Sequence, residues 1–299
     1  MRLVALVTCD VIPNLTDDDR SLIPALAAHG VRAAPAVWDD DAVEWRTFDA
    51  VVIRSPWDYH RKAQRFLSWI DRVDALGVQL INPAPVLRWN ADKVYLRELS
   101  SLDVPVVPTW WVEQGETTPL IEILRQAGWS RAVVKPAVAA TAYRTWTTEA
   151  GSAAADETRF RELVADGRVL VQPFVEAITA EGEWSLVFFG GEYAYSVLKV
   201  VQHGDFRVQN EFGGSVLGRD VDPAIVAQAS DVLDAAPFSR ADLAYARVDG
   251  CVEHGRFVLM ELEVLEPALF LQIGRGRTEV FASHLAQRIA HRTNSMDKG

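Results

Sequence analysis

An apolar strand that carries carboxylates on one face is the feature that most constrains how this chain can fold. Residues 258–267 are Val-Leu-Met-Glu-Leu-Glu-Val-Leu-Glu-Pro. Side chains alternate across a strand, so Glu261 and Glu263 share one face. Acidic side chains are seldom buried in such a strand unless a partner or a cation neutralises them. The strand is therefore predicted to border a charged site, or else to lie at a sheet edge with one solvated face.

The preceding strand adds a third carboxylate, Asp249, together with Arg247. A three-residue turn at 253–255 would place Asp249 on the same face as both glutamates, whereas a two-residue turn would move it to the other face. Neighbouring carboxylates raise one another's pKa unless a cation is bound, and hard oxygen ligands suit magnesium. Paired carboxylates could instead serve acid–base chemistry on a sugar.

Basic residues near predicted strand and helix ends suggest a second half of the same site. Lys135 and Lys199 belong to predicted strands, and Lys93 lies early in a predicted helix. A single lysine in such a place usually has no functional role: its aliphatic chain packs on the surface and its ammonium group stays in water. Beside a carboxylate-bound magnesium, however, lysines would neutralise nucleotide phosphates. Arg207, shortly before the diglycine at 213–214, could hold a phosphoryl or carboxylate group through two hydrogen bonds.

The order of the predicted elements divides the chain into parts. Strands at 3–7, 31–37, 49–54 and 78–81 alternate with helices at 16–29 and 61–76, which predicts a parallel α/β domain. The rest has helices at 90–101, 120–128, 156–166, 221–236 and 278–291, and strands at 132–134, 169–172, 184–189, 193–201, 245–252 and 257–264. The proline-marked bend after residue 172 exposes backbone groups that could bind an adenine edge, or it forms a plain interdomain hinge.

Composition narrows the function classes. The chain has 299 residues, which suggests about two domains, and a formal charge of −11, which disfavours nucleic-acid and anionic-membrane partners. Its two cysteines, Cys9 and Cys251, suit neither a disulfide framework nor a zinc cluster. Asp10 interrupts the apolar N-terminal segment too early for a signal peptide, and no apolar stretch is long enough to span a membrane. A cytoplasmic protein is expected.

Taken together and in this order, these motifs resemble those of the ATP-grasp superfamily of ligases. They are Asn90 with Lys93, Lys135-Pro136, Gln172 to Glu176, Glu183, Arg207 with Asn210, Asp249, and Glu261-Leu262-Glu263. The resemblance covers nearly the whole chain and implies a fold with α/β and α+β parts. An N-terminal parallel α/β domain would span 1–90 and an ATP-grasp domain 91–299. Within the latter, a lid subdomain at 104–175 and a C-terminal subdomain at 176–292 would grip ATP between two antiparallel sheets.

The resemblance also implies roles for single residues. They are Lys93 and Lys135 on the α- and β-phosphates, the backbone of Gln172 to Val175 (with Phe174) on adenine, Glu176 and Glu183 on ribose, Arg207 with Lys199 and Asn210 on the transferring phosphoryl group, and Asp249, Glu261 and Glu263 on one or two magnesium ions, with manganese as an alternative. Two departures from the family pattern stand out. Glu263 replaces an Asn that many members have, and the loop at 137–144 that would cover the phosphates contains no glycine.

Residues 54–60 and 263–271 are similar to those of small glutathione-synthetase-like members, and among these to cyclo-ligases. Because open α/β sheets bind ligands at the carboxyl ends of their strands, a small carboxylic acid is expected to meet residues there. The candidates are Arg54, Ser55, Trp57 and Asp58, with Arg247 from the later strand, and His60, His203 and Glu211 as candidate general bases.

The first hypothesis is a ligase that activates its substrate as an acyl phosphate and closes a five-membered ring by attack of a nitrogen in the same molecule. A ligase that joins two molecules is the alternative, and a non-catalytic nucleotide-binding regulator is a second. A homo-oligomer is left open.

Overall fold

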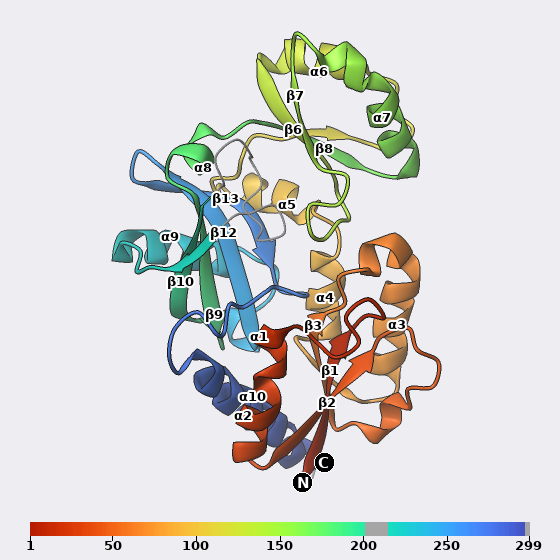
Figure 1. Cartoon of the computed structure of the whole chain (residues 1–299), viewed down its shortest axis with the longest axis vertical. Helices are drawn as coiled ribbons and strands as arrows, with labels where there is room; N and C mark the ends of the chain where they lie inside the picture. Colours follow the sequence, from red (N-terminus) through yellow and green to blue (C-terminus); the bar gives the residue numbers. More distant parts are fainter. Residues whose placement is uncertain (201–214, 297–299) are drawn as a thin grey trace.

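Three β-sheets organise the molecule. The computed structural model describes residues 1–200 and 215–296 (Figure 1). The first sheet has the strand order β2-β1-β3-β4, the lid sheet has the order β5-β8-β6-β7, and the third sheet has the order β11-β10-β9-β12-β13. Figure 1 shows the lid sheet at the top, the third sheet at the centre left and the first sheet below. No helix in the described part of the chain is long and apolar enough to cross a membrane.

The first sheet is parallel, as predicted, and is buried on both faces. Its strands are β1 (Arg2–Thr8), β2 (Val31–Val37), β3 (Ala50–Ser55) and β4 (Gln79–Ile81). Val4 and Leu6 of β1 pack in one core cluster with residues of α2 (Leu22–Ala28) and α10 (Arg277–Met296), whereas Ala5 and Val7 pack in another cluster with α3 (Ala63–Ala75). Parallel strands covered on both faces lack polar alternation, which explains their continuous apolar sequence.

The helix expected at 16–29 is interrupted. The structure has α1 (Asp17–Arg20) and then α2, with Ser21 between them. Thr16 caps α1 as its Oγ1 accepts a hydrogen bond from the Asp19 N–H at 3.1 Å. Pro24 explains the interruption. Its ring clashes with the backbone carbonyl four residues earlier, and it has no N–H to donate to that carbonyl.

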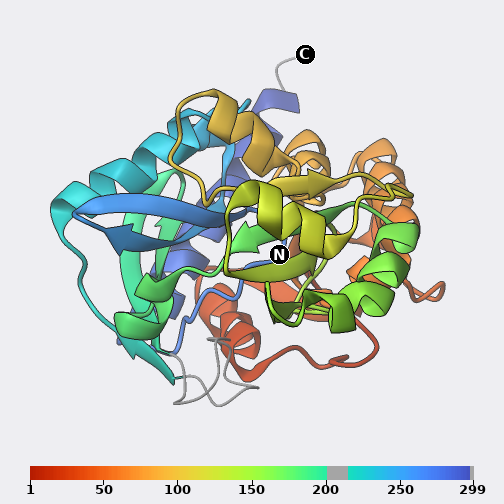
Figure 2. The ribbon, with the colours of Figure 1, turned by 90° about the horizontal axis from the view of Figure 1, so that it is seen from above.

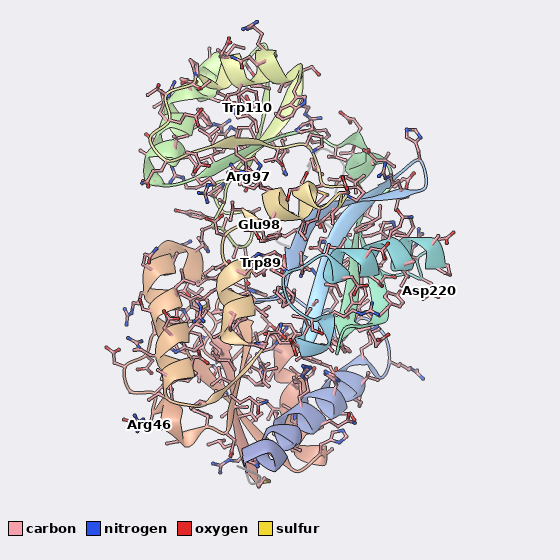
Figure 3. The ribbon with its side chains drawn as sticks, turned by 180° about the vertical axis from the view of Figure 1, so that it is seen from behind. Arg46, Trp89, Arg97, Glu98, Trp110 and Asp220 are labelled. Atoms are coloured by element: carbon pink, nitrogen blue, oxygen red, sulfur yellow. The ribbon has the colours of Figure 1, made fainter. Side chains whose placement is uncertain are left out.

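Two short helices join the first sheet to the rest, where a single one was expected at 90–101. They are α4 (Ala84–Asn90) and α5 (Tyr95–Ser101), so Lys93 lies in the turn between them. The prolines at 83 and 85 flank the first position of α4, where a missing N–H costs nothing. Figure 3 labels Trp89 on α4 with Arg97 and Glu98 on α5, between the lid and the domain below; the Trp89 indole N–H donates to Glu98 at 2.7 Å.

The lid sheet and the third sheet are antiparallel. The lid sheet contains β5 (Trp110–Val112), β8 (Val169–Pro173), β6 (Arg131–Pro136) and β7 (Trp146–Glu149), packed against α6 (Leu120–Ala127) and α7 (Ala153–Asp166). The third contains β11 (Ser215–Gly218), β10 (Glu192–Val200), β9 (Glu183–Phe189), β12 (Tyr245–Glu253) and β13 (Arg256–Glu263). The remaining helices are α8 (Glu176–Ala180) and α9 (Pro223–Asp234), with 3-10 turns at Trp45–Thr47, Tyr59–Lys62 and Arg240–Asp242. β7, β11 and α8 were not predicted from the sequence.

The first and third sheets are joined by buried polar contacts and by the last helix. α10 follows the third sheet in the chain but packs beside α2, on the N-terminal domain (Figure 1). The hydroxyl of Tyr245 on β12 lies within hydrogen-bonding distance of the carbonyls of Ile53, Ile81 and Leu265, at 2.9, 3.2 and 3.1 Å. The third sheet is thereby fixed against the carboxyl end of the first.

A buried ion pair completes this junction and yields a prediction. Arg54 is fully buried and donates from Nε to Asp19 at 2.8 Å and from Nη2 to the Pro267 carbonyl at 2.8 Å. R54M would leave the Asp19 carboxylate buried without a counter-charge, so it should lower the free energy of unfolding by about 3–5 kcal/mol. Urea denaturation measures this. R125A, which removes an exposed ion pair with Glu122, should cost at most about 1 kcal/mol; equal losses in both variants would contradict the assignment.

Candidate active site

A pocket of about 350 Å³ lies between the lid sheet and the third sheet. The lid contributes residues of β6 and β8 and of the loop that follows β6, and the third sheet contributes residues of β9, β10, β12 and β13. Trp57 enters from the N-terminal domain. Figure 2, seen from above, shows the lid in front of the boundary between the third sheet and the N-terminal domain. The pocket therefore touches all three parts of the chain.

The acidic face of the third sheet depends on the β12–β13 turn and on a β-bulge beside it. The β12–β13 turn has two residues, His254 and Gly255, with φ of +52° and +77°, and Glu253 pairs with Arg256. Of the two turn lengths that the sequence left open, the structure has the shorter one. A β-bulge then shifts the register, so that Gly250 pairs with Leu259 but Asp249 pairs with Glu261 and Arg247 pairs with Glu263. One extra residue, Met260, restores the face that the shorter turn would have lost.

Each carboxylate on this face contacts a basic group. Arg247 contacts Asp249 at 2.7 Å and Glu263 at 2.5 Å through the same Nη2 atom. Lys93 reaches across from the turn after α4 to Glu261 at 2.8 Å, and Lys199 of β10 contacts Glu183 at 2.5 Å. Opposite charges thus offset the repulsion among the carboxylates.

The pKa shifts divide the carboxylates into two groups. Burial opposes ionisation of Asp249, but Arg247 and Lys199 outweigh it and bring the pKa of Asp249 to about 2. Burial also opposes ionisation of Glu261, where Lys93 and Lys135 prevail and lower the pKa. For Glu263, burial together with the charges of Glu261 and Asp249 exceeds the help from Arg247 and raises the pKa to about 8. Glu263 is therefore a carboxylate that a further cation would ionise.

The opposite wall of the pocket carries Lys135 and the bend after β8. Lys135 lies at the end of β6, and burial lowers its pKa. It has no ion pair among the residues that the structure describes. Gln172, Phe174 and Val175 line the pocket, and Gln172 donates to the Thr109 hydroxyl at 2.9 Å. Glu176 differs from the expectation, because it begins α8, is exposed and does not line the pocket.

The N-terminal residues expected to bind substrate are only partly at the pocket. Trp57 lines it, whereas Arg54, Ser55 and Asp58 do not. Arg54 is held by Asp19, as described above. The Ser55 hydroxyl is buried against Thr8 at 3.3 Å, and Asp58 accepts from the Trp38 indole at 2.8 Å. These three expectations are corrected, since each polar group already has a partner inside the domain.

Four candidates with a catalytic role expected from the sequence lie at 201–214, outside the described residues: Arg207, Asn210, His203 and Glu211. Lys199 and Arg247 do line the pocket. Sequence reasoning gave no role to Glu266, Met260 or Phe270, which line it as well. The sequence offered one signal that Glu266 belongs to the site: it is an acid, followed by a proline, shortly after the strand that carries Glu261 and Glu263.

The donor set suits a magnesium ion only in part. Glu261 and Glu263 face the pocket with side chains 28% and 21% exposed, whereas the side chain of Asp249 is 3% exposed and enclosed by Arg247, Ser185 and Lys199. Within 1–200 and 215–296, no three His, Cys, Asp or Glu side chains form a group that could hold a metal ion. Oxygen donors are the right chemistry for magnesium, and two glutamates are a common protein share of its ligands. The expected three-carboxylate set is thus reduced to two accessible members.

The loop after β6 reaches from the lid to the N-terminal domain. Ala139 to Ala142 and Thr145 line the pocket, and Thr141, Ala142 and Arg144 have φ of +52°, +53° and +49°. Non-glycine residues in this conformation are strained, so outside contacts must hold them. Tyr143 supplies such a contact: its ring lies 4.6 Å from the ring of His60. His60 does not line the pocket.

Comparison with known proteins agrees with this architecture. Residues 4–82 match the family model described as the N-terminal domain of D-cycloserine synthetase DcsG. The cycloserine biosynthesis protein DcsG of Streptomyces lavendulae is 31% identical over 301 residues, which cover 97% of this chain and 99% of that protein. The chain belongs to the DcsG family.

Solved structures place this family within a wider fold. The crystal structure of DcsG matches with a TM-score of 0.84 at 30% identity, covering 96% of this chain and 99% of that one. The D-alanine–D-alanine ligase of Bacillus anthracis, solved with ATP, matches with a TM-score of 0.67 at 14% identity, covering 98% and 100%. The RimK domain protein ATP-grasp of Sphaerobacter thermophilus matches with a TM-score of 0.69 at 20% identity, covering 96% and 99%. The predicted ATP-grasp fold is confirmed, and the protein is a ligase of this class.

The raised pKa of Glu263 predicts a pH dependence of stability. Between about pH 4.5 and 8 the unfolded chain releases a proton that the folded state retains, so the free energy of unfolding falls as the pH rises. E263Q removes this contribution. The free energy of unfolding of E263Q should therefore fall less steeply with pH than that of the wild type, and the two slopes should differ by up to about 1.4 kcal/mol per pH unit. Urea denaturation at pH 5 to 8, without nucleotide or divalent cations, measures the slopes. E253Q, at the exposed end of β12, is the control; an unchanged slope in E263Q would refute the shift.

Proposed function

We propose that this protein is an ATP- and magnesium-dependent cyclo-ligase that converts O-ureido-D-serine into D-cycloserine. The observation that carries the proposal is the 31% identity with a cycloserine biosynthesis protein over 97% of the chain. The pocket supports it, because basic side chains and carboxylates face one another across a space large enough for a nucleotide's phosphates and a small carboxylic acid. The substrate is thus a small molecule.

The nucleotide would lie along the lid. Lys135, which has no ion pair among the described residues, and Lys93 would contact its α- and β-phosphates, and the backbone at 172–175 would hold adenine. Glu183 would be the ribose contact, since Glu176 faces away. Glu261 and Glu263 would hold one or two magnesium ions, with manganese as an alternative. A bound magnesium ion would neutralise charge on the phosphates.

The proposed reaction has three steps. A carboxylate oxygen of the substrate attacks the γ-phosphorus, ADP leaves and an acyl phosphate forms. The oxygen-linked nitrogen of the ureido group attacks the acyl carbon, phosphate leaves and the five-membered ring closes. One water then removes the carbamoyl group as carbon dioxide and ammonia. Lys199 and Arg247 would stabilise the transferring phosphoryl group and the carboxylate. The resemblance gives Arg207 and Asn210, outside the described residues, a role in the same phosphoryl transfer. Proximity assists the ring closure, because nucleophile and electrophile belong to one molecule.

The first test is ADP release from ATP and magnesium with O-ureido-D-serine as the sole added substrate. We expect ADP and cycloserine in equal amounts. K135M should lower kcat/KM by about 100-fold or more, because it removes a charge aimed at the phosphates. K62M, whose ammonium pairs with Asp39 outside the pocket, should retain activity. ADP release that requires an added amine would replace this proposal with a ligase that joins two molecules.

The loop contact of Tyr143 with His60 yields a second prediction. An acyl phosphate must be protected from water, and the loop forms part of the pocket wall. Y143A should loosen the loop, so that more than one ADP is released per cycloserine formed. Parallel quantification of both products measures this ratio. A ratio that stays at one would show that Tyr143 does not help to exclude water.

A further inference from the structure

One acid in the pocket has no basic partner. Glu183, Asp249, Glu261 and Glu263 each contact a Lys or Arg within 4 Å. Glu266 also lines the pocket and is only 8% exposed, yet within 1–200 and 215–296 its carboxylate forms no ion pair. Lys93, whose charge acts on Glu266, has its ammonium on Glu261 at 2.8 Å. A buried carboxylate without a counter-ion is costly, unless a ligand supplies the missing cation.

The N-terminal domain holds Glu266 in place. The Trp57 indole donates to its backbone carbonyl at 3.2 Å, and the nearby Tyr59 hydroxyl lowers the pKa of its carboxyl group. Tyr59 is itself buried and packs on Phe66 with ring centroids 4.9 Å apart. Burial raises the pKa of Glu266 to about 7, which agrees with a carboxylate that lacks a cation. The group is therefore oriented in advance of any ligand.

Its neighbours indicate which ligand group fits. Two residues further on, the Ala268 carbonyl accepts from Arg247 Nη1 at 2.8 Å, and the Arg247 guanidinium lies 5.5 Å from the Phe270 ring. Arg247 of β12 is thus fixed to the stretch of chain that also carries Glu266. Both side chains line the pocket without forming an ion pair with each other, so a cationic and an anionic group face the same space. An α-amino acid carries the complementary pair, a carboxylate and an ammonium on one carbon.

We propose that Glu266 binds the α-ammonium group of the amino-acid substrate and so makes the enzyme selective for amino acids over other carboxylic acids. The inference rests on the proposed function, because it takes O-ureido-D-serine as the substrate. Glu266 then sets the orientation in which the substrate carboxylate faces Arg247 and the phosphoryl donor. The residue binds substrate, and takes no proton in the reaction.

The test pairs E266Q with a substrate that lacks the amino group, 3-(ureidooxy)propanoic acid. Loss of a hydrogen-bonded charge pair corresponds to about 10- to 100-fold. Wild-type enzyme should therefore favour O-ureido-D-serine over the desamino compound by at least that factor in kcat/KM. E266Q should reduce this ratio to near one, through a higher KM for O-ureido-D-serine, with the KM for ATP unchanged. E253Q should behave as wild type.

Other outcomes are equally decisive. If E266Q lowers kcat/KM for both compounds by the same factor, Glu266 does not bind the α-ammonium group and the inference is overturned. Y59F keeps the ring and removes only the hydroxyl. It should also lower the kcat/KM preference for O-ureido-D-serine over the desamino compound, but by less than E266Q does.

Wild-type enzyme inactive on both compounds would overturn the proposed function instead. Glu266 is then tested by ADP release with α-amino acids and their desamino counterparts. A preference for amino acids that E266Q abolishes supports the inference. No such preference, or no ADP release with any amino acid, overturns it.

Discussion

The guanidinium of Arg247 is the group on which the acidic wall of the pocket depends. It bridges Asp249 on its own strand and Glu263 on the next, and its remaining nitrogen holds the Ala268 carbonyl. Without it, carboxylates on adjacent strands would face one another in a buried space, where like charges repel strongly. One side chain therefore both permits the acidic face and fixes the chain that follows β13, including Glu266 and Phe270.

The same stretch of chain is fixed from the other side by the N-terminal domain. Asn82 donates to the carbonyls of Tyr245 and Val264 at 2.9 and 2.7 Å, and its own carbonyl accepts from the Ala244 N–H. Arg54 holds the Pro267 carbonyl. Backbone groups just after a strand end would otherwise be unsatisfied inside the protein, which costs about 1–3 kcal/mol each. The end of the pocket at Glu266 and Phe270 is thus built by residues of two domains together.

Periodicity in the sequence was sufficient for most strands and for the parallel N-terminal domain, because buried strands and amphipathic helices leave regular apolar patterns. The fold as a whole was predicted from the resemblance of the ordered motifs to a known superfamily. It was insufficient wherever a single residue changed the geometry. Pro24 divides a helix, and the bulge at Met260 keeps Asp249 on the face of both glutamates, from which a two-residue turn alone would have removed it. Arg54 was misassigned for a different reason. An arginine at the carboxyl end of a parallel strand has the sequence pattern of a ligand contact, and its partner Asp19 lies 35 residues away.

Charge pairing explains why the candidate site could be predicted only in outline. The sequence shows which lysines and acids are candidates for the site, but which of them neutralise each other depends on register and on contacts between domains. In the folded pocket, Lys93 and Lys199 are bound to acids, whereas Lys135 and Glu266 have no ion pair among the described residues. Burial disfavours the charged form of both, by lowering the pKa of Lys135 and raising that of Glu266. A ligand pair that brings an anion to the first and a cation to the second would relieve both penalties at once. A nucleotide phosphate and an amino-acid ammonium meet that requirement together.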